Sequence, residues 1–491
     1  MANSLTNLRQ LTENSIVDDI TLAETGARPF VYVCAFLSSM SSLLLGYECG
    51  VMAGAMGPIV DYMQLDVVEE GIIIGCVSII SVVGSLMAGR VADQLGRKMT
   101  IAIGSILFAA GALLSAAALD FWVLLIGRLI TGVGVGFAFV IAPLYTSETS
   151  PSRYRGVLTS LTEFFIDCGI LLGYLSNIVL ANVSNEWRWM IGLGAAPAFI
   201  IMLSLLVMPE SPRWLMMQGR TAEAEAALRL VYPEYEVSDT MAQIQSVIDI
   251  ESKHGCDWTT ILRPNKTLRL TMITGLGISF FQQATGNDAV VYYTDRILRD
   301  AGIVEQGPRL WATAGVGLCK TVFVIIPMLC ADQLGRRFIL LLGQSLMVLA
   351  LLGMAAASSV NAPILAVTSL CGCMATFSMG IGPGTHIVGT EVFPLMMRGR
   401  IFSLALAINR FVSGTVAISF PVIADIISVS ATFGIFTAVT ALSVLFVYFL
   451  VPETSGKSLE EIQVFFRQLA GEEEEEEKEP LVVNAIIQEC E

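Results

Sequence analysis

Charged side chains stand inside several long apolar stretches of this chain. Glu48 lies in the first stretch, Arg128 in the fourth and Lys320 in the eighth. A charge at the centre of a bilayer costs about 2.5 kcal/mol or more, so each is expected to serve a purpose. A carboxyl that can pair with an arginine can also gain and lose a proton. These residue types could therefore form a pair that is poised to gain or lose a proton.

Two further groups of polar residues lie inside apolar stretches. Glu163 and Asp167 are four positions apart, so on a helix they share one face and must pair or look into a cavity. Gln282, Gln283 and Asp288 stand close together in another apolar stretch. Amides both donate and accept hydrogen bonds, which a polyhydroxylated solute requires.

The elements that must position these residues are membrane-spanning helices. The chain is 54% hydrophobic and 14% charged, whereas soluble proteins carry roughly 25% charged residues. Apolar runs of about 20 residues mark transmembrane helices. We predict an all-α membrane protein with twelve spans: 30–57, 70–89, 99–118, 121–143, 157–181, 189–208, 270–296, 310–330, 338–358, 363–390, 401–423 and 431–451.

A repeated charged loop indicates that two similar halves were joined. The segment ADQLGRK at 92–98 returns as ADQLGRR at 331–337. Such internal repeats are typical of secondary transporters, and here they predict two pseudo-symmetric six-helix bundles. The predicted organisation is an N-terminal arm (1–29), a first bundle (30–208), a linker with short helices (209–269), a second bundle (270–451) and a largely disordered acidic tail (452–491).

Acids and bases beyond the loop repeat at nearly the same offset. Glu148 precedes Arg155 by seven positions, as Glu391 precedes Arg398. We expect an ion-pair network that latches the outward-open state; the alternative is static surface pairs worth about 0–1 kcal/mol each. The predicted gate residues are Asp93, Arg97, Glu148, Arg155, Glu210, Asp332, Arg336, Glu391, Arg398 and Glu453.

The distribution of Lys and Arg predicts the orientation. With both termini in the cytosol, 21 of these residues fall in cytosolic segments and four in outer loops. Basic residues accumulate on the cytosolic side of membrane proteins. The gate residues would then lie on the cytosolic face. Because no organelle signal is evident, we expect the plasma membrane.

Several motifs resemble the sugar porter family of the major facilitator superfamily. They include GRVADQLGRK, PESPRWLMMQGR, FFQQATGNDAVVYY, EVFPLMMRGR and PETSGKSLEEI, which together cover both halves. The segments PSRYRGVLTSLTEFFIDCGILLGYLSN and SFFQQATGNDAVVYYTDRI are most similar to polyol and monosaccharide proton symporters of plants and algae. The resemblance implies alternating access, with solute bound at mid-membrane.

The resemblance also implies a role for the charged pair in the first half. Proton-coupled members pair an acid at the position of Glu48 with an arginine at that of Arg128. Protonation of the acid would break the pair and allow the halves to rock. The usual acid is Asp, and Glu retains the titratable group. The alternative is a permanent ion pair that holds helices together.

The substrate contacts of the family fall on residues of both halves, with three departures. Glu163 replaces a glutamine and Asp288 an asparagine, which makes both polyol-like. His386 replaces a tryptophan, so we expect altered selectivity or a pH-dependent one; the alternative is a tolerated core substitution. The predicted substrate-binding residues are Glu163, Gln282, Gln283, Asp288, Tyr292, His386 and Asn409.

Three further intramembrane charges need partners. Lys320 and Arg410 have counterparts in polyol-type members, whereas Asp167 has none. We expect Lys320 or Arg410 to neutralise Asp288 or Glu163, and the sequence leaves the choice open.

The predicted function is proton-coupled symport of a polyol or monosaccharide. A facilitative hexose or inositol carrier and a non-transporting sugar sensor are the alternatives. No phosphate loop, nucleophile with a base, or metal-ligand spacing occurs, so we expect neither an enzyme nor an ATP-driven pump. The expected partners are a small polyhydroxylated solute, protons and the lipid bilayer. Cofactors, metals and nucleic acid are not expected, and a monomer would suffice.

Overall fold

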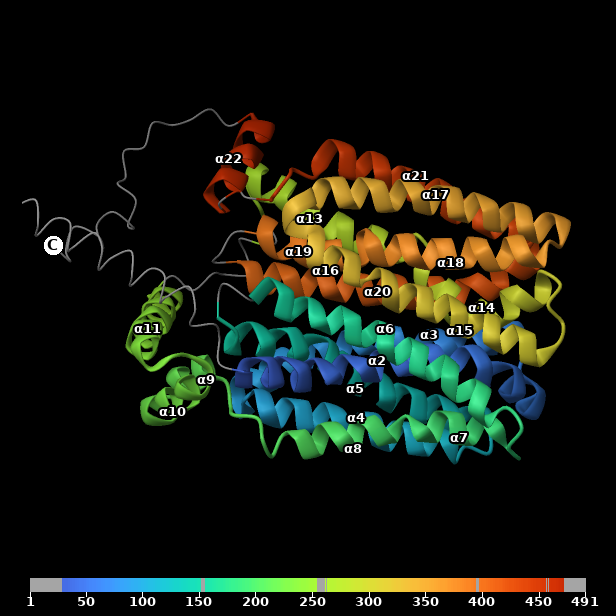
Figure 1. The fold of residues 1–491 in the computed structure, drawn as a ribbon, viewed down its shortest axis with the longest axis horizontal. Helices are drawn as coiled ribbons and strands as arrows, with labels where there is room; N and C mark the ends of the chain where they lie inside the picture. Colours follow the sequence, from blue (N-terminus) through green and yellow to red (C-terminus); the bar gives the residue numbers. More distant parts are fainter. Residues whose placement is uncertain are drawn as a thin grey trace, which may run out of the picture.

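The computed structural model is a bundle of long helices that run side by side. It describes residues 29–151, 155–253, 261, 263–393, 397–455, 457 and 459–471. The first half (blue to green) and the second half (yellow to red) pack against each other along their length (Figure 1). The helices of the first half are α2 (Pro29–Met63), α3 (Val67–Leu95), α4 (Arg97–Ala116), α5 (Phe121–Thr149), α6 (Arg155–Leu180), α7 (Glu186–Leu193) and α8 (Ala195–Ser204).

The second half repeats this arrangement with more interruptions. Its helices are α13 (Lys266–Ala284), α14 (Asn287–Asp300), α15 (Gln306–Phe323), α16 (Ile325–Leu334), α17 (Arg336–Val360), α18 (Pro363–Met379), α19 (Ile381–Val392), α20 (Arg398–Ile427) and α21 (Val429–Leu450). Among the described residues, eleven helical segments are long and apolar enough to cross a membrane. The pair α13 and α14 occupies the remaining predicted span, so the twelve-helix fold is confirmed.

Short helices lie at one end of the bundle, which we call the linker end (Figure 1). They are α9 (Pro212–Met217), α10 (Thr221–Val231), η1 (Glu234–Glu236), α11 (Val237–Lys253) and α22 (Leu459–Ala470). The linker helices were expected, but α22 lies within the predicted tail. Ile462 and Phe466 are buried where α22 packs on α13 and α19. The arm before residue 29 and the tail from residue 472 lie outside the described residues.

Helix starts at the opposite end follow from local sequence. Asp66 accepts a hydrogen bond from the Glu69 backbone at 2.7 Å, and the Glu69 side chain accepts one from the Asp66 backbone at 3.1 Å. This capping box satisfies two backbone donors at the start of α3. Asp120 caps α5 in the same way, through the Val123 backbone at 3.0 Å.

The break between α13 and α14 requires a glycine. Gly286 has φ +88°, a backbone conformation that side-chain-bearing residues rarely adopt. A Cβ atom there would also lie 2.6 Å from the Phe436 ring. The break ends α13 directly after Gln282 and Gln283 and begins α14 directly before Asp288. An uninterrupted span at 270–296 was therefore wrong, and the interruption lies beside the polar residues of the second half.

The halves are tied together at the end opposite the linker. Arg296 Nη1 of α14 lies 2.8 Å from Glu70 Oε2 of α3. Nearer the middle of the bundle, the Cys49 thiol donates to the Tyr292 hydroxyl at 3.1 Å, which joins α2 to α14. The Tyr174 hydroxyl donates to the Val291 carbonyl at 2.8 Å, which joins α6 to α14.

Candidate functional site

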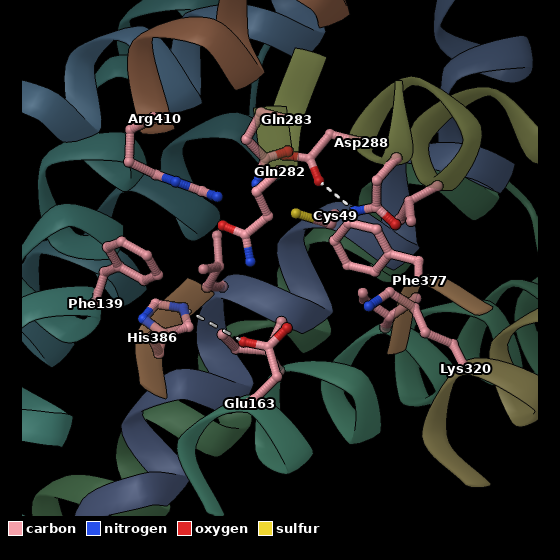
Figure 2. A pocket seen from close by; sticks show the side chains of 15 residues that line it. Cys49, Phe139, Glu163, Gln282, Gln283, Asp288, Lys320, Phe377, His386 and Arg410 are labelled. Carbon is pink, nitrogen blue, oxygen red and sulfur yellow. Dashed lines mark hydrogen bonds and ion pairs between the residues drawn. The ribbon is translucent and has the colours of Figure 1, made fainter. Parts of the chain in front are cut away.

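A small cavity lies between the two halves near the middle of the bundle. Figure 2 shows side chains from both halves pointing into it. The lining residues are Leu45, Cys49, Phe139, Glu163, Ile166, Ile170, Gln282, Gln283, Asn287, Asp288, Val291, Lys320, Phe377, His386 and Arg410.

Amide side chains form one wall of the cavity. Gln282 Nε2 donates to the Gly382 carbonyl at 2.7 Å, and its Oε1 accepts from Asn409 Nδ2 at 2.5 Å. Arg410 Nη2 donates to Asn409 Oδ1 at 2.6 Å. The break after α13 thus presents amides whose orientation is set by neighbouring groups, which suits selective binding of hydroxyls.

Gln283 connects a carboxylate to a cation. With its nitrogen turned toward Asp288, Nε2 lies 3.1 Å from both carboxylate oxygens and Oε1 lies 2.7 Å from Arg410 Nη2. Asn287 Nδ2 donates to Asp288 Oδ1 at 2.9 Å, and the Ser413 hydroxyl donates to Oδ2. Asp288 also stands in the first turn of α14, where the helix dipole favours a negative charge.

Glu163 and His386 meet from opposite halves. Glu163 Oε2 on α6 lies 3.8 Å from His386 Nε2 on α19. Their side chains face one another across the cavity in Figure 2. The structure thus brings two of the three departures from the family pattern into one place.

Lys320 has a partner that the sequence analysis did not pair with it. Its Nζ lies 2.5 Å from Asp167 Oδ1, not against Asp288 or Glu163, so that part of the prediction was wrong. The Ser378 hydroxyl donates to Asp167 Oδ2 at 3.3 Å. Lys320 and Asp167 are 2% and 0% exposed. Because α6 and α15 belong to different halves, this buried ion pair joins them.

The surroundings of the Arg410 guanidinium differ from those of the Lys320 amine. Among the described residues no carboxylate lies within ion-pair distance of its guanidinium, and its link to Asp288 runs through Gln283. The guanidinium lies 4.7 Å from the centre of the Phe139 ring, and Lys320 Nζ lies 4.9 Å from that of Phe377. Sequence reasoning missed both aromatic residues, because an apolar side chain in an apolar span carries no sign of lining a cavity.

Two predicted substrate contacts lie behind the cavity wall. Asn409 is 1% exposed and orients Gln282 and Arg410. Tyr292 is 1% exposed and bonds to Cys49. Neither lines the cavity, which corrects their predicted direct role. Their side chains fill the space between helices, whereas Gln282 and Gln283 line the cavity.

Glu48 and Arg128 form an ion pair inside the first half. Arg128 also donates from Nε to the Ile73 carbonyl at 2.9 Å. The two residues are 2% and 1% exposed. The pair spans α2 and α5 and lies directly beside the cavity, since the next residue, Cys49, is on its wall.

The predicted gate residues form two clusters at the linker end. In the first, Arg97 Nη2 and Nε lie 2.7 and 2.8 Å from the Glu148 carboxylate, and Arg97 Nη1 lies 3.5 Å from Asp93. Glu210 accepts from the Arg97 backbone at 2.9 Å and so caps α4.

The second cluster repeats this design. Arg336 Nη2 lies 3.3 Å from Glu391, and Glu453 accepts from the Arg336 backbone at 2.9 Å. In both clusters these bonds join helices of one half, so a latch between the halves stays a prediction. The side chains of Arg155, Asp332 and Arg398 lie outside the described residues.

Comparisons with known proteins match both halves. A family model described as "Sugar (and other) transporter" matches residues 34–466. "Probable polyol transporter 4" of Arabidopsis thaliana is 41% identical over 452 residues, 90% of this chain and 86% of that protein. "Glucose transporter GlcP" of Staphylococcus epidermidis is 32% identical over 445 residues, 90% and 98% of the two chains. The solved structure of the proton:xylose symporter XylE bound to 6-bromo-6-deoxy-D-glucose superposes with a TM-score of 0.78 at 25% identity, covering 89% of this chain and 99% of that chain.

Proposed function

Because this chain belongs to the sugar transporter family, we propose that it is a proton-coupled symporter of a polyol or monosaccharide. The observation that carries the proposal is the cavity between the halves, where amides and carboxylates from both halves face one space. The matched relatives include a protein named as a polyol transporter, one named as a glucose transporter and a proton:xylose symporter. All three names are consistent with a substrate rich in hydroxyl groups.

The cavity supplies donors and acceptors in balance. Gln282 and Gln283 offer both, Glu163 and Asp288 accept, and Arg410 donates. A solute with adjacent hydroxyls satisfies such a set, whereas an apolar solute would leave buried polar groups unpaired at a cost of about 1–3 kcal/mol each. The residues behind the wall keep these groups oriented, so binding requires little reordering.

Proton coupling would depend on Glu48 and Arg128. A proton on Glu48 removes the charge that holds Arg128, and the guanidinium is then left with the Ile73 and Ile74 carbonyls. Since α2 and α5 are joined by this pair, its loss would loosen the first half beside the cavity. The proton gradient would then drive the rocking of the two bundles around the solute.

The chain would be an integral protein of the plasma membrane, with the linker end in the cytosol. The excess of Lys and Arg in the segments at this end supports that orientation. The ion-pair clusters would then lie on the cytosolic face, and the pair Arg296–Glu70 on the outer face.

The decisive experiment is solute uptake by the wild type and Glu48→Gln in transport-null cells. Hexoses, pentoses, linear polyols and inositol are supplied as radiolabelled solutes at two pH values. We expect uphill accumulation by the wild type, stronger at the lower pH, and exchange without accumulation by Glu48→Gln. Glu223→Gln, on an exposed linker pair, is the matched control and should behave as wild type.

The outcomes separate the candidate functions. Full accumulation by Glu48→Gln would contradict the coupling role of Glu48. Equilibration without accumulation by the wild type would indicate a facilitative carrier. No flux of any solute, in protein that reaches the membrane, would indicate a sensor.

A further inference from the structure

Glu163 and His386 lie on opposite walls of the cavity at an unusual separation. The distance of 3.8 Å between Glu163 Oε2 and His386 Nε2 is too long for a direct hydrogen bond. It is short enough for strong electrostatic interaction in a site with little water. One residue belongs to α6 in the first half and the other to α19 in the second, so any group held between them touches both halves.

Two aromatic rings pack near the imidazole. The centre of the Phe139 ring of α5 lies 6.1 Å from that of His386 and the centre of the Phe402 ring of α20 lies 6.2 Å from it, both edge to face. The Nε2 atom of His386 faces Glu163. The geometry is therefore built into the packing of three helices.

The other charges around the cavity leave one negative charge unbalanced. Lys320 and Asp167 compensate each other at 2.5 Å. Asp288 and Arg410 are joined through Gln283. That leaves the carboxylate of Glu163, whose one partner within ion-pair distance among the described residues is the imidazole of His386.

Lys320 and Arg410 also act electrostatically on Glu163, but each already has a carboxylate to balance, Lys320 directly and Arg410 through Gln283. The opposite charges of Glu48 on α2 and Arg128 on α5 already balance each other. An uncompensated charge in a buried site is costly, and a group in that position takes up a proton instead. One proton shared by Glu163 and His386 makes the whole cavity neutral.

We propose that Glu163 and His386 form a second proton-binding site in the cavity, completed by one hydroxyl of the substrate. The added proton resides on the Glu163 carboxyl, which donates to the hydroxyl, and the hydroxyl donates to the unprotonated Nε2 of His386. It spans the gap that is too long for a direct bond. The proton comes from solution, and no other bond is made or broken. The inference rests on the proposed function, since it requires a hydroxylated substrate in this cavity.

Binding of the substrate should then carry a proton with it. Above the pH at which the free pair loses its proton, affinity should weaken about tenfold for each pH unit, because the bound state holds one more proton than the free state. Glu48 lies within the first half, paired with Arg128, so its contribution can be removed by substitution.

The test is calorimetric binding to the purified full-length protein in detergent, with sorbitol and glucose as probes. Titrations in buffers of different ionisation enthalpy give the number of protons taken up per bound sugar. In a Glu48→Gln background, at a pH above that at which the free pair loses its proton, we expect uptake of about one proton per bound sugar and the tenfold pH dependence. In Glu48→Gln/Glu163→Gln we expect no proton uptake and less than a twofold change in affinity between pH 5.5 and 8.

Two further variants keep the test decisive. Glu163→Asp retains the carboxyl and should retain proton uptake, even if Glu163→Gln binds too weakly to measure. Glu223→Gln, far from the cavity, should match its parent. Thermal melting of each variant checks that it is folded.

Equal proton uptake with and without the Glu163 carboxyl overturns the proposal, as does a Glu48→Gln protein that binds sugar without taking up protons. Failure of the proposed function is distinct from both: it appears as a wild type that binds neither sugar, or as full accumulation by Glu48→Gln.

Discussion

The cavity and the linker end both hold basic residues beside carboxylates, but they use them differently. At the linker end, Arg97 and Arg336 occupy equivalent positions in the two halves. Each side chain pairs with one carboxylate, while a second carboxylate accepts from the backbone at the start of its helix. In the cavity, the bond between Lys320 and Asp167 crosses between the halves. Charges at the linker end thus join helices within each bundle, whereas this pair joins one bundle to the other.

Among the substitutions that test this difference, Lys320→Ala should have the largest effect. It leaves Asp167 buried without its cation, which costs about 3–5 kcal/mol. We expect a much lower melting temperature in detergent and loss of transport. The double variant Asp167→Ala/Lys320→Ala should recover much of the stability but not the transport. A double variant as unstable as Lys320→Ala would show that the pair is not the source of the loss.

Substituting the equivalent arginines compares the two clusters directly. Arg97 makes two short bonds to Glu148, while Arg336 lies 3.3 Å from a more exposed Glu391. Arg97→Gln should cost about 2–3 kcal/mol, as expected for buried charged hydrogen bonds, and Arg336→Gln about 1 kcal/mol. Guanidinium or thermal unfolding of the two variants measures the difference. Equal losses would mean that the repeat matters more than local geometry.

A glycine in each cluster offers a smaller test. Gly96 has φ +91° and Gly335 has φ +87°, and a Cβ at Gly96 would lie 2.5 Å from Glu210 Oε2. Gly96→Ala should therefore cost about 1–3 kcal/mol through backbone strain and displacement of the capping carboxylate. Thermal melting checks this, and Gly89→Ala, where a Cβ meets open space, is the matched control. A melting point like that of the control would rule out the strain.

We expect the smallest effect on stability and transport from breaking a solvent-exposed ion pair. Arg220 and Glu223 are 2.6 Å apart on the exposed surface of the linker. Solvent screening and side-chain entropy leave such a pair with little net effect. Arg220→Gln should leave both the melting temperature and solute uptake unchanged. A measurable loss of uptake would instead implicate the linker helices in transport.

The features predicted from the sequence are those that depend on neighbouring residues. Apolar runs predicted twelve spans, and the repeated loop predicted two halves, because each signal lies within a continuous segment of the chain. The structure also pairs Glu48 with Arg128, as the family resemblance implied. The break between α13 and α14 at Gly286 was not predicted, because the sequence around a single glycine does not determine its φ angle.

The sequence by itself therefore determined the class of protein, the two-bundle architecture and the list of buried polar residues. Only the tertiary structure decided which of them meet. Asp167 rather than Asp288 faces Lys320, Asn409 stands behind the wall rather than on it, and Glu163 faces His386. The physical reason is that these partners lie on different helices, in most cases from different halves. Their separation depends on how the bundles pack, a property that no single stretch of sequence contains.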